Sequence, residues 1–332
     1  MITKLEWYGL RKNLPLAVFF LFVGITAIIV NNQIKNQQEL VHEHTNTAAE
    51  QVCIRIEEFV EARLSALEVM RKRWVQRPEF SQERFLKFAE LYYTGYPGFQ
   101  AINWVDTSGI ICWVYPEEPN REAIGIDIHN HPDPKCREVF ARVEKTQEYG
   151  ITPCMTLFQG GKGFATDWPL IYSGELQGYL NGVFKIKPLI DICLAKGVFD
   201  DFWLEIYEEE ELIYQCKPGD NISKTGDWYA EKEVRFRGKS WRLIMEPKSK
   251  LYSAATITGN LPLLFFCLLV SIGMSLLVYS LIRRVDICRI ALEDRKYAEE
   301  SLKGSEERYR TMIENANDMN LDVGYSRQYD IF

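Results

Sequence analysis

The sequence is poor in positive charge, and no stretch of it is strongly basic. Its 332 residues contain 39 lysines and arginines against 46 aspartates and glutamates, which leaves a formal net charge of −7. Proteins that bind nucleic acid usually present a basic patch that neutralises phosphates. We therefore expect no nucleic-acid partner.

Recognisable cysteine motifs are also missing. Eight cysteines are present, six of them within residues 31–260, but none forms a C-x-x-C pair and their spacing matches no disulfide framework. The sequence leaves open whether these six are free thiols or form disulfides. It predicts no zinc site and no cofactor.

One short stretch is a weak candidate for a divalent metal. Asp127, His129, His131 and Asp133 alternate along it, and both residue types bind metals. Alternation in a loop does not make side chains converge, and no second cluster supports this stretch. We predict no metal here.

Two uninterrupted apolar stretches are present. Residues 14–30 are 17 positions without a charge, and residues 261–282 are 22. Because ~20 apolar residues in a helix cross a bilayer, both are predicted to be transmembrane helices. A cleaved signal peptide is the alternative for the first, but its apolar run is longer than the usual ~7–15 residues and no A-x-A-like site follows. A buried core helix is the alternative for the second, but no polar face is visible.

Basic residues near these stretches set the expected orientation. The cytoplasmic side of a membrane protein is enriched in lysine and arginine. Lys35 is the single basic residue in 31–40, and 251–260 has none. The other flanks carry Lys4, Arg11, Lys12, Arg283, Arg284, Arg289, Arg295 and Lys296. We therefore predict a multi-pass protein of the cell (inner) membrane with cytoplasmic termini and residues 31–260 outside the cytoplasm.

The exterior segment begins with a helical pattern. Residues 31–74 contain no proline or glycine, and apolar residues recur at helical spacing. A long helix continuing out of the membrane is predicted there. A shorter amphipathic helix follows, with Ser81 as its expected N-cap.

The rest of the exterior segment alternates strands and helices. The first group predicts a five-stranded antiparallel sheet with one helix beside it, a PAS-like layout. Its strands are expected at 99–105, 110–115, 151–158, 164–171 and 176–184, and its helix at 134–148. A smaller subdomain is expected from a helix at 187–195 and strands at 202–207, 211–214, 233–236 and 240–245.

The segment after the second apolar stretch is charged and helical. Small and apolar residues recur at spacings of three and four between Cys288 and Ala316, which is a weak heptad seam. This pattern favours a parallel homodimer. A merely solvated charged helix is the alternative.

These patterns together predict an α+β protein. A long N-terminal helix is followed by PAS-like antiparallel-sheet sensor domains, and two transmembrane helices flank them. The predicted segments are a cytoplasmic N-terminus (1–13), transmembrane helix 1 (14–30), the exterior sensor (31–260), transmembrane helix 2 (261–282) and a cytoplasmic helical linker (283–332). Within the sensor we expect a long helix (31–75), a membrane-distal PAS-like domain (76–185) and a membrane-proximal subdomain (186–250).

The exterior segment resembles the CHASE domain, the extracellular sensor of histidine kinases, cyclases and plant cytokinin receptors. Four motifs in the same order carry this resemblance: PGFQAINWVDTSGIICWVYPEEPN (97–120), IGID (124–127), GITPCMTLFQGGKGF (150–164) and WPLIYSGELQGYLNGVF (168–184). Residues 305–319 resemble the opening of a PAS domain, but the following residues do not continue that pattern. The resemblance implies the N-terminal part of a sensor histidine kinase or cyclase.

The resemblance also implies a ligand site in the membrane-distal domain. The residues that match the family's ligand-binding positions are Asp127, Ile151 and Thr152. The walls depart from the family, because Trp104, Trp113, Phe164 and Trp168 make them heavily aromatic, so cytokinin itself does not follow as the ligand. An ionised carboxylate such as that of Asp127 pairs well with N–H donors in a dry pocket. The alternative for Asp127 is a turn or helix-cap residue.

The predicted function is therefore transmembrane signal transduction, in which a small extracytoplasmic ligand acts on a cytoplasmic output such as a histidine kinase of a two-component system. This chain is not expected to be an enzyme. One alternative is a dimeric membrane scaffold without output. Another is an extracytoplasmic enzyme using Asp127 with His129 or His131, which no nucleophile motif in the sequence supports.

Overall fold

The computed structural model describes residues 4–76, 81–194, 196–216, 228–256 and 258–326. The two ends of the chain, residues 1–3 and 327–332, lie outside the described residues. So does residue 195, where the helix predicted over 187–195 would end. The chain divides into two compact units. One comprises Met1–Asn32 and Asn260–Phe332, and the other is Gln33–Gly259.

The first unit consists of long helices with apolar surfaces. It holds the N-terminal part of α1 (Lys4–Val75) and the whole of α7 (Leu261–Ser326). Both helices are long and apolar enough to cross a membrane. The side chains of Phe20 and Phe265 are 61% and 64% exposed, which is typical of residues that face lipid rather than water.

The second unit contains a six-stranded antiparallel sheet, which we call the distal sheet. Its strand order is β2-β1-β6-β5-β3, and β4 also pairs with β5. The strands are β1 (Phe99–Val105), β2 (Ile111–Tyr115), β3 (Gly150–Ile151), β4 (Met155–Thr156), β5 (Lys162–Tyr172) and β6 (Glu175–Lys185). One continuous strand was predicted over 151–158. Two short strands form instead, because Pro153 between them has no N–H for a sheet hydrogen bond.

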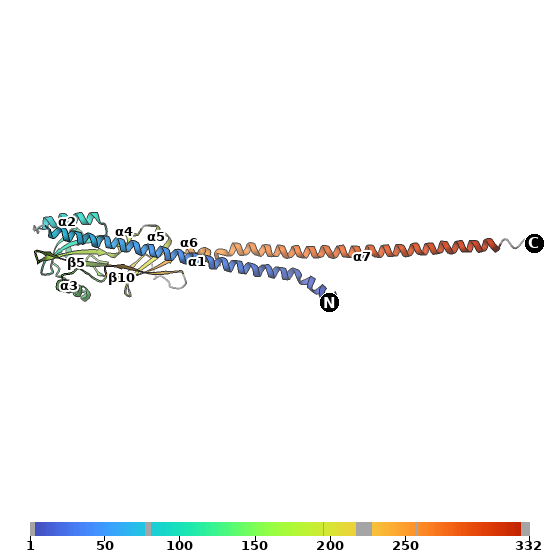
Figure 1. Cartoon of the computed structure of the whole chain (residues 1–332), viewed down its shortest axis with the longest axis horizontal. Helices are drawn as coiled ribbons and strands as arrows, with labels where there is room; N and C mark the ends of the chain where they lie inside the picture. Colours follow the sequence, from blue (N-terminus) through green and yellow to red (C-terminus); the bar gives the residue numbers. More distant parts are fainter. Residues whose placement is uncertain (1–3, 77–80, 195, 217–227, 257, 327–332) are drawn as a thin grey trace, which may run out of the picture. The chain divides into compact units, whose positions relative to one another are not determined.

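Helices cover the distal sheet on both faces. Figure 1 shows α2 (Gln82–Gly95) and α3 (Pro134–Thr146) on opposite sides of β5. The 3-10 helices η1 (Glu118–Ala123) and η2 (Ile128–Asn130) lie in the segment between β2 and α3. The predicted cap of α2 is confirmed, since the Arg84 amide donates to the Ser81 hydroxyl at 3.4 Å.

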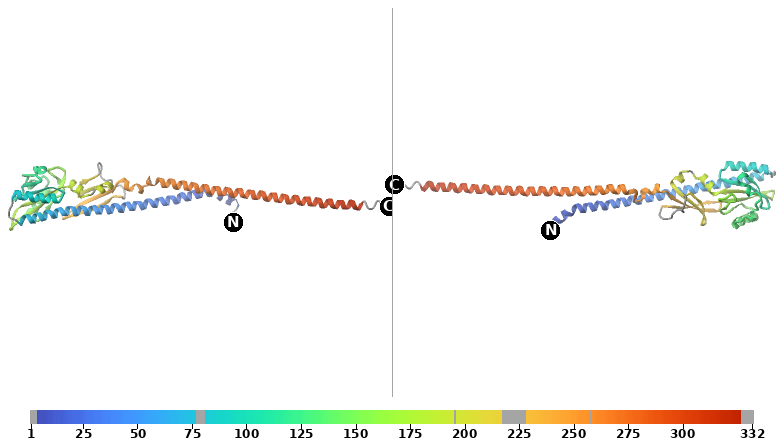
Figure 2. Two further views of the ribbon diagram at one scale, coloured as in Figure 1. Left: turned by 90° about the horizontal axis from the view of Figure 1, so that it is seen from above. Right: turned by 180° about the vertical axis from the view of Figure 1, so that it is seen from behind.

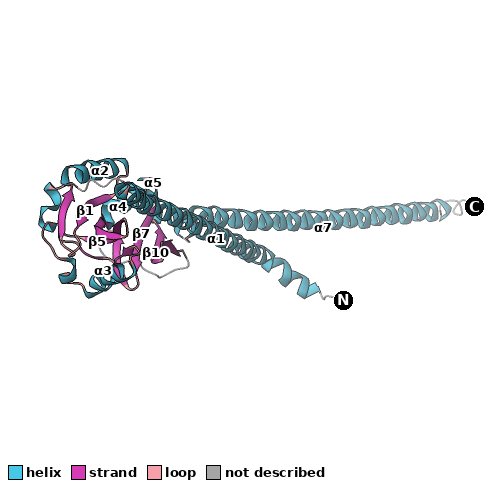
Figure 3. Ribbon diagram, turned by 60° about the vertical axis from the view of Figure 1, so that its left-hand side comes forward, coloured by secondary structure: helices cyan, strands magenta, loops and turns pink. Residues whose placement is uncertain are grey.

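A smaller antiparallel sheet, the proximal sheet, follows in the same unit. Its order is β8-β7-β10-β9, with β7 (Phe202–Glu208), β8 (Glu211–Gln215), β9 (Ala230–Phe236) and β10 (Lys239–Pro247). Helices α4 (Ile186–Cys193) and α5 (Lys196–Asp201) precede it. A short helix α6 (Ser249–Tyr252) and the 3-10 helices η3 (Ser253–Ala255) and η4 (Thr258–Asn260) follow it. Figures 2 and 3 show the strands of this unit grouped beside the C-terminal half of α1. The predicted α+β class is confirmed.

One apolar stripe of α1 packs against both sheets. Its members Ile56, Leu64, Leu67, Met70 and Trp74 are at most 2% exposed and belong to one continuous core. Such a stripe at helical spacing is what holds a helix against a sheet.

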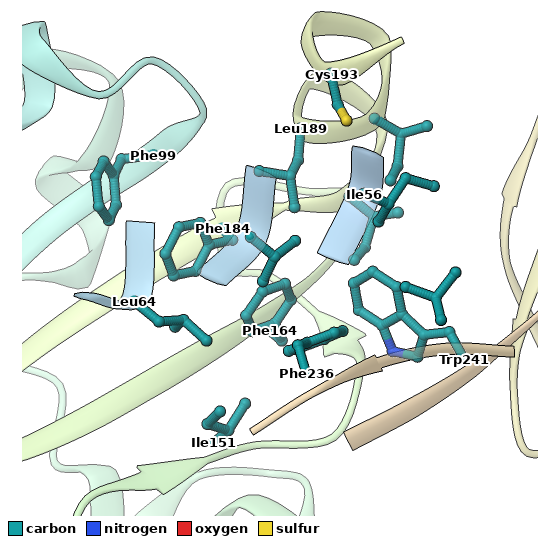
Figure 4. Packing of buried hydrophobic residues seen from close by; sticks show 14 of the residues in the cluster. Ile56, Leu64, Phe99, Ile151, Phe164, Phe184, Leu189, Cys193, Phe236 and Trp241 are labelled. Carbon is teal, nitrogen blue, oxygen red and sulfur yellow. The ribbon is translucent and has the colours of Figure 1, made fainter. Parts of the chain in front are cut away.

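Aromatic rings connect the two sheets within this core. The ring of Phe164 on β5 lies 4.8 Å from that of Phe184 and 5.7 Å from that of Trp241 on β10. Figure 4 shows these three side chains among the buried residues of the core. Ion pairs reinforce the same junction. The Arg237 guanidinium lies 2.8 Å from the Glu61 carboxylate and 3.1 Å from that of Glu68, both on α1.

A glycine allows α1 to approach the distal sheet closely. A Cβ at Gly182 on β6 would lie 2.4 Å from Cδ1 of the fully buried Leu67. We therefore expect Gly182→Ala to lower the free energy of unfolding by about 1–3 kcal/mol, the usual range for overpacking. Chemical denaturation would measure it. Gly95→Ala is the matched control, because no atom lies within 4 Å of its Cβ position. Equal stability of the two variants would contradict this packing.

Candidate functional site

A cavity lies against one face of the distal sheet. Its volume is about 50 Å³, more than the ~10–15 Å³ that a single water molecule needs. Its lining comes from β1, β2, β5 and β6, from α3, from the segment that carries η1 and η2, and from residues 152–159, which include β4. Most of that lining is apolar, including Ile111, Ile126, Ile128, Leu157 and Val183.

Three polar side chains cross the floor of this cavity in a row. Asn103 on β1, Asn181 on β6 and Asp167 on β5 are register partners on adjacent strands, so their side chains share a face. The Asn103 amide donates to Oδ1 of Asn181 at 2.8 Å, and the Asn181 amide donates to Oδ1 of Asp167 at 2.7 Å. We call these three residues the polar row. All three are at most 4% exposed.

The polar row has an unused acceptor. Oδ1 of Asn103 is buried and has no hydrogen-bond partner among the described residues, and its side chain lines the cavity. A buried polar atom without a partner costs about 1–3 kcal/mol. Such atoms are rare in folded proteins, and this one is buried too deeply for a molecule in the cavity to reach it.

Asp167 adds a buried negative charge to the row. Burial raises the pKa of its carboxyl to about 6, and the hydrogen bond from Asn181 offsets only part of this effect. In the part of the chain that the structure describes, no lysine, arginine or histidine forms an ion pair with Asp167. Its carboxylate is thus ionised near neutral pH without a cation from the protein.

Two further polar side chains line the cavity. Thr152 accepts a hydrogen bond from the Ala165 amide at 2.8 Å through its hydroxyl oxygen, which leaves the hydroxyl proton able to donate. His131 accepts from the Asp133 amide at 3.1 Å through Nδ1. Burial lowers the pKa of His131, so this imidazole is neutral near pH 7 and offers one N–H.

The six predicted site residues occupy three different environments, of which the third, that of Asp127, is described in the next paragraph. Thr152 lines the cavity. Ile151, Trp104, Trp113 and Phe164 contribute to the core on the opposite face of the sheet, against α1 and α2. The ring of Trp104, for example, lies 5.6 Å from that of Trp74 and 5.9 Å from that of Phe85.

Asp127 lies at the edge of the cavity cover rather than in its lining. Its carboxylate caps η2 by accepting from the His129 amide at 2.9 Å, and it also pairs with Nδ1 of His129 at 2.8 Å. Nε2 of the same ring lies 3.0 Å from Glu144 on α3. Partial burial opposes protonation of His129, but the two carboxylates outweigh it and raise its pKa. Asp127 therefore holds the segment that presents Ile128 to the cavity.

The described residues contain no group of three or more histidine, cysteine or acidic side chains able to hold a metal ion. His129 illustrates why, since Asp127 and Glu144 bind opposite nitrogens of its ring and do not converge on one point.

Sequence reasoning missed the polar row. Its trace in the sequence was one polar residue inside each of three apolar strands: Asn103 in AINWV, Asp167 in ATDWPL and Asn181 in YLNGV. A buried strand position usually holds an apolar side chain, so a polar residue in each of three apolar strands indicates a candidate site.

Comparison with known proteins gives the fold but no family. No protein-family model matches the chain, and no curated protein sequence does. An extracellular ligand-binding receptor from Desulfohalobium retbaense is similar in structure, with a TM-score of 0.51 and 14% identity. The match covers 61% of this chain and 40% of that receptor, so this chain matches less than half of the receptor's length.

Two chemoreceptor domains from Pseudomonas aeruginosa PAO1 are also similar. The ligand-binding domain of PctC in complex with GABA has 14% identity and a TM-score of 0.44, covering 61% of this chain and 98% of that one. The domain of PctB in complex with L-Arg has 14% identity and a TM-score of 0.46, covering 64% and 98%. The fold of this chain is similar to that of the Desulfohalobium retbaense receptor, the match with a TM-score above 0.5.

The buried charge of Asp167 leads to a prediction about the free energy of unfolding at different pH values. A carboxyl whose pKa is higher in the folded than in the unfolded state loses stability as pH rises through the interval between the two values. For Asp167 that interval runs from 3.8 to about 6. We expect Asp167→Asn, which keeps an acceptor for Asn181, to raise the free energy of unfolding by roughly 3 kcal/mol at pH 7.

The same comparison at low pH provides the control. At pH 4 the wild-type carboxyl is largely protonated when folded, so the two proteins should unfold at similar denaturant concentrations. Thermal and chemical unfolding at both pH values would measure this difference. An Asp167→Asn variant that is less stable at pH 7 would show that the charge has a partner.

Proposed function

We propose that this chain is the sensory part of a membrane receptor that binds a small ligand in the cavity of the distal sheet. The observation that carries the proposal is the buried carboxylate of Asp167, which lines a mostly apolar cavity and has no ion-pair partner among the described residues. A packed core would place apolar side chains at such positions, whereas a binding site leaves hydrogen-bonding capacity for its ligand. The sensor-domain fold supports the same reading.

The proposed receptor crosses the inner membrane twice and exposes its second unit outside the cytoplasm. The apolar helices α1 and α7 supply the spans. Lysine and arginine flank the spans on the side of the two termini, as in Arg283 and Arg284, while residues 251–260 contain none. This asymmetry supports cytoplasmic termini.

The proposed output follows α7. The resemblance of the exterior motifs to CHASE domains, and of residues 305–319 to a PAS opening, supports a cytoplasmic histidine kinase or cyclase as the partner of this sensor. We also propose that two copies pair through α7. Its exposed residues Leu302, Tyr309 and Met312 lie on the spacing of the predicted seam.

Binding in the cavity would act on α1 through the distal sheet, because that one sheet separates the cavity from the core that α1 completes. Asp167 on β5 faces the cavity, and its neighbours Thr166 and Trp168 face the core that α1 completes. A ligand that shifts β5 or β6 therefore shifts the surface on which α1 packs. Because α1 is one continuous helix from Lys4 to Val75, displacement at its C-terminal half is carried along its axis.

The proposed ligand site can be tested with two matched threonine variants. Thr152→Val removes a hydroxyl that lines the cavity, and Thr166→Val removes an equally buried hydroxyl on the other face of the sheet. Compounds from a metabolite library that raise the melting temperature of the full chain in nanodiscs would be titrated against both. We expect Thr152→Val to lower their affinity about tenfold, the loss of one hydrogen bond.

Thr166→Val controls for general damage to the sheet and should bind like wild type. Asp127→Asn belongs in the same titration, because the Asp127 side chain caps η2 and is not itself part of the lining. Equal weakening by both threonine variants would place the ligand elsewhere.

The proposed topology can be tested by labelling single cysteines in intact cells, in a background without the eight native cysteines. A membrane-impermeant maleimide should modify a cysteine placed at Pro119 in η1. A cysteine placed at Glu300 in α7 should react only after the cells are permeabilised. Equal reaction at both positions in intact cells would overturn the two-span arrangement.

A further inference from the structure

One short segment covers the cavity and is held from two sides. This segment, residues 126–131, which we call the cover, presents Ile128 and His131 to the cavity. On one side it is bound to the turn between β1 and β2, where the Ile128 amide donates to the Gly109 carbonyl oxygen at 2.9 Å. Neither partner of this backbone hydrogen bond titrates, so this attachment does not depend on pH.

On the other side, two side chains of α3 hold the cover. The Arg137 guanidinium donates to the carbonyl oxygen of His131. The Glu144 carboxylate lies 3.0 Å from Nε2 of His129. The second of these contacts includes an imidazole, which is a group that changes its charge near neutral pH.

Both ring nitrogens of His129 face carboxylates, because Nδ1 lies 2.8 Å from Asp127. A protonated imidazole donates from both nitrogens, whereas a neutral one donates from one and has a lone pair on the other. A neutral His129 therefore directs a lone pair at one of two negative charges. Asp127 belongs to the cover itself and also accepts from the His129 amide at 2.9 Å. The contact that can separate is thus the one with Glu144.

Two elements, α3 and the turn between β1 and β2, pack against the ring of His129. Phe140 of α3 meets it edge-on, with ring centroids 5.2 Å apart. The turn lies directly beneath it, since a Cβ at Gly109 would be 2.5 Å from a ring carbon. The acidic residue of that turn, Asp106, accepts from two backbone amides of the turn. Partial burial opposes protonation of His129, and the carboxylates of Asp127 and Glu144 outweigh it and raise the pKa.

We propose that His129 is a pH-dependent clamp on the cover and so controls entry to the cavity. When protonated it joins the cover to Glu144 of α3, and when it loses its proton it releases the cover, so that molecules enter more readily. The inference rests on the proposed function, because it concerns access to that site. The raised pKa gives the direction. The contact is complete in acid and is lost as pH rises through the pKa of the folded His129.

Cys136 can report access to the cavity without any ligand. It lies on α3, lines the cavity and is 2% exposed. A small disulfide reagent that reacts with thiols in acid would be applied to the full chain in nanodiscs. Peptide mass spectrometry would then give the rate of modification at Cys136 separately from the other cysteines. Rates are compared between variants at the same pH, either about pH 5 or about pH 9, outside the range in which histidine titrates.

Two substitutions of Glu144 should have opposite effects. Glu144→Ala removes the clamp, so Cys136 should react about threefold faster than in the wild type at about pH 5, the effect of a partly exposed ion pair. At about pH 9 this variant and the wild type should react alike. Glu144→Gln accepts from a protonated His129 and donates to a neutral one, so it clamps in both states. It should match the wild type at about pH 5 and react about threefold more slowly at about pH 9.

Glu138→Ala is the matched control, because it removes another exposed glutamate of α3, and it should react like the wild type at both pH values. The clamp is overturned if Glu144→Ala differs from the wild type by the same factor at both pH values, or if all four proteins react alike. A Glu138→Ala variant that reacts as fast as Glu144→Ala would overturn the role of Glu144. Thermal unfolding would show that each variant is folded.

Failure of the clamp and failure of the proposed function are distinguishable. The Cys136 rates are measured without a ligand, whereas the proposed ligand site is tested by the affinity of library compounds for Thr152→Val. Cys136 rates that ignore pH would overturn the clamp and leave the ligand site standing.

Discussion

The apolar stripe of α1 is the constraint on which both sheets of the second unit depend. The distal sheet buries one face against it, and Phe164 and Trp241 join the proximal sheet to the same core. Each fully buried large apolar side chain contributes about 1.5–3 kcal/mol relative to exposure, so five such residues in one helix are a substantial part of a marginal total. The close approach at Gly182 and the ion pairs of Arg237 depend on the same helix position.

This arrangement assigns different tasks to the two faces of the distal sheet. Successive residues of a strand point to opposite faces, so Trp104 joins the core with α1 while its neighbour Asn103 lines the cavity. The core face has large aromatic and aliphatic side chains. The cavity face has the polar row, whose buried charge and unused acceptor oppose folding. A face that gives up stability in this way is where a binding function is expected.

The elements were largely predictable because each depends on local patterns. Helical spacing in α1 and the Ser81 cap of α2 act over a few residues, and the structure has both. Pro153 divided one predicted strand for an equally local reason. The apolar stretches likewise predicted two helices that are long and apolar enough for a membrane. The CHASE resemblance, the orientation and the output stay predictions, since no family model and no curated protein sequence matches the chain.

The site was harder to predict because it depends on which face of a strand each residue occupies. Aromatic residues such as Trp113 look like ligand walls in a sequence, yet the structure packs this one against Phe85 of α2 with ring centroids 5.8 Å apart. A shift of one residue along a strand decides between core and cavity. Asp127 was chosen by resemblance, and its geometry is that of a cap. The energetic cost of a buried residue is a better indicator of a candidate site than resemblance. Asp167 and Asn103 occupy buried strand positions, where a charge and an unpaired acceptor lower the stability of the fold.

The proposed transmission follows from the thickness of a single sheet. The polar row and the residues that contact α1 alternate along the same strands, so no intervening layer can absorb a displacement. Gly182 is adjacent to Asn181 of the polar row, and a Cβ there would already collide with Leu67 of α1. Because packed interiors are nearly incompressible, a ligand that repositions Asn181 must also move Leu67 or reduce its packing. In the proposed receptor, ligand binding and the position of α1 would therefore be linked at this contact, and such a linkage is reciprocal.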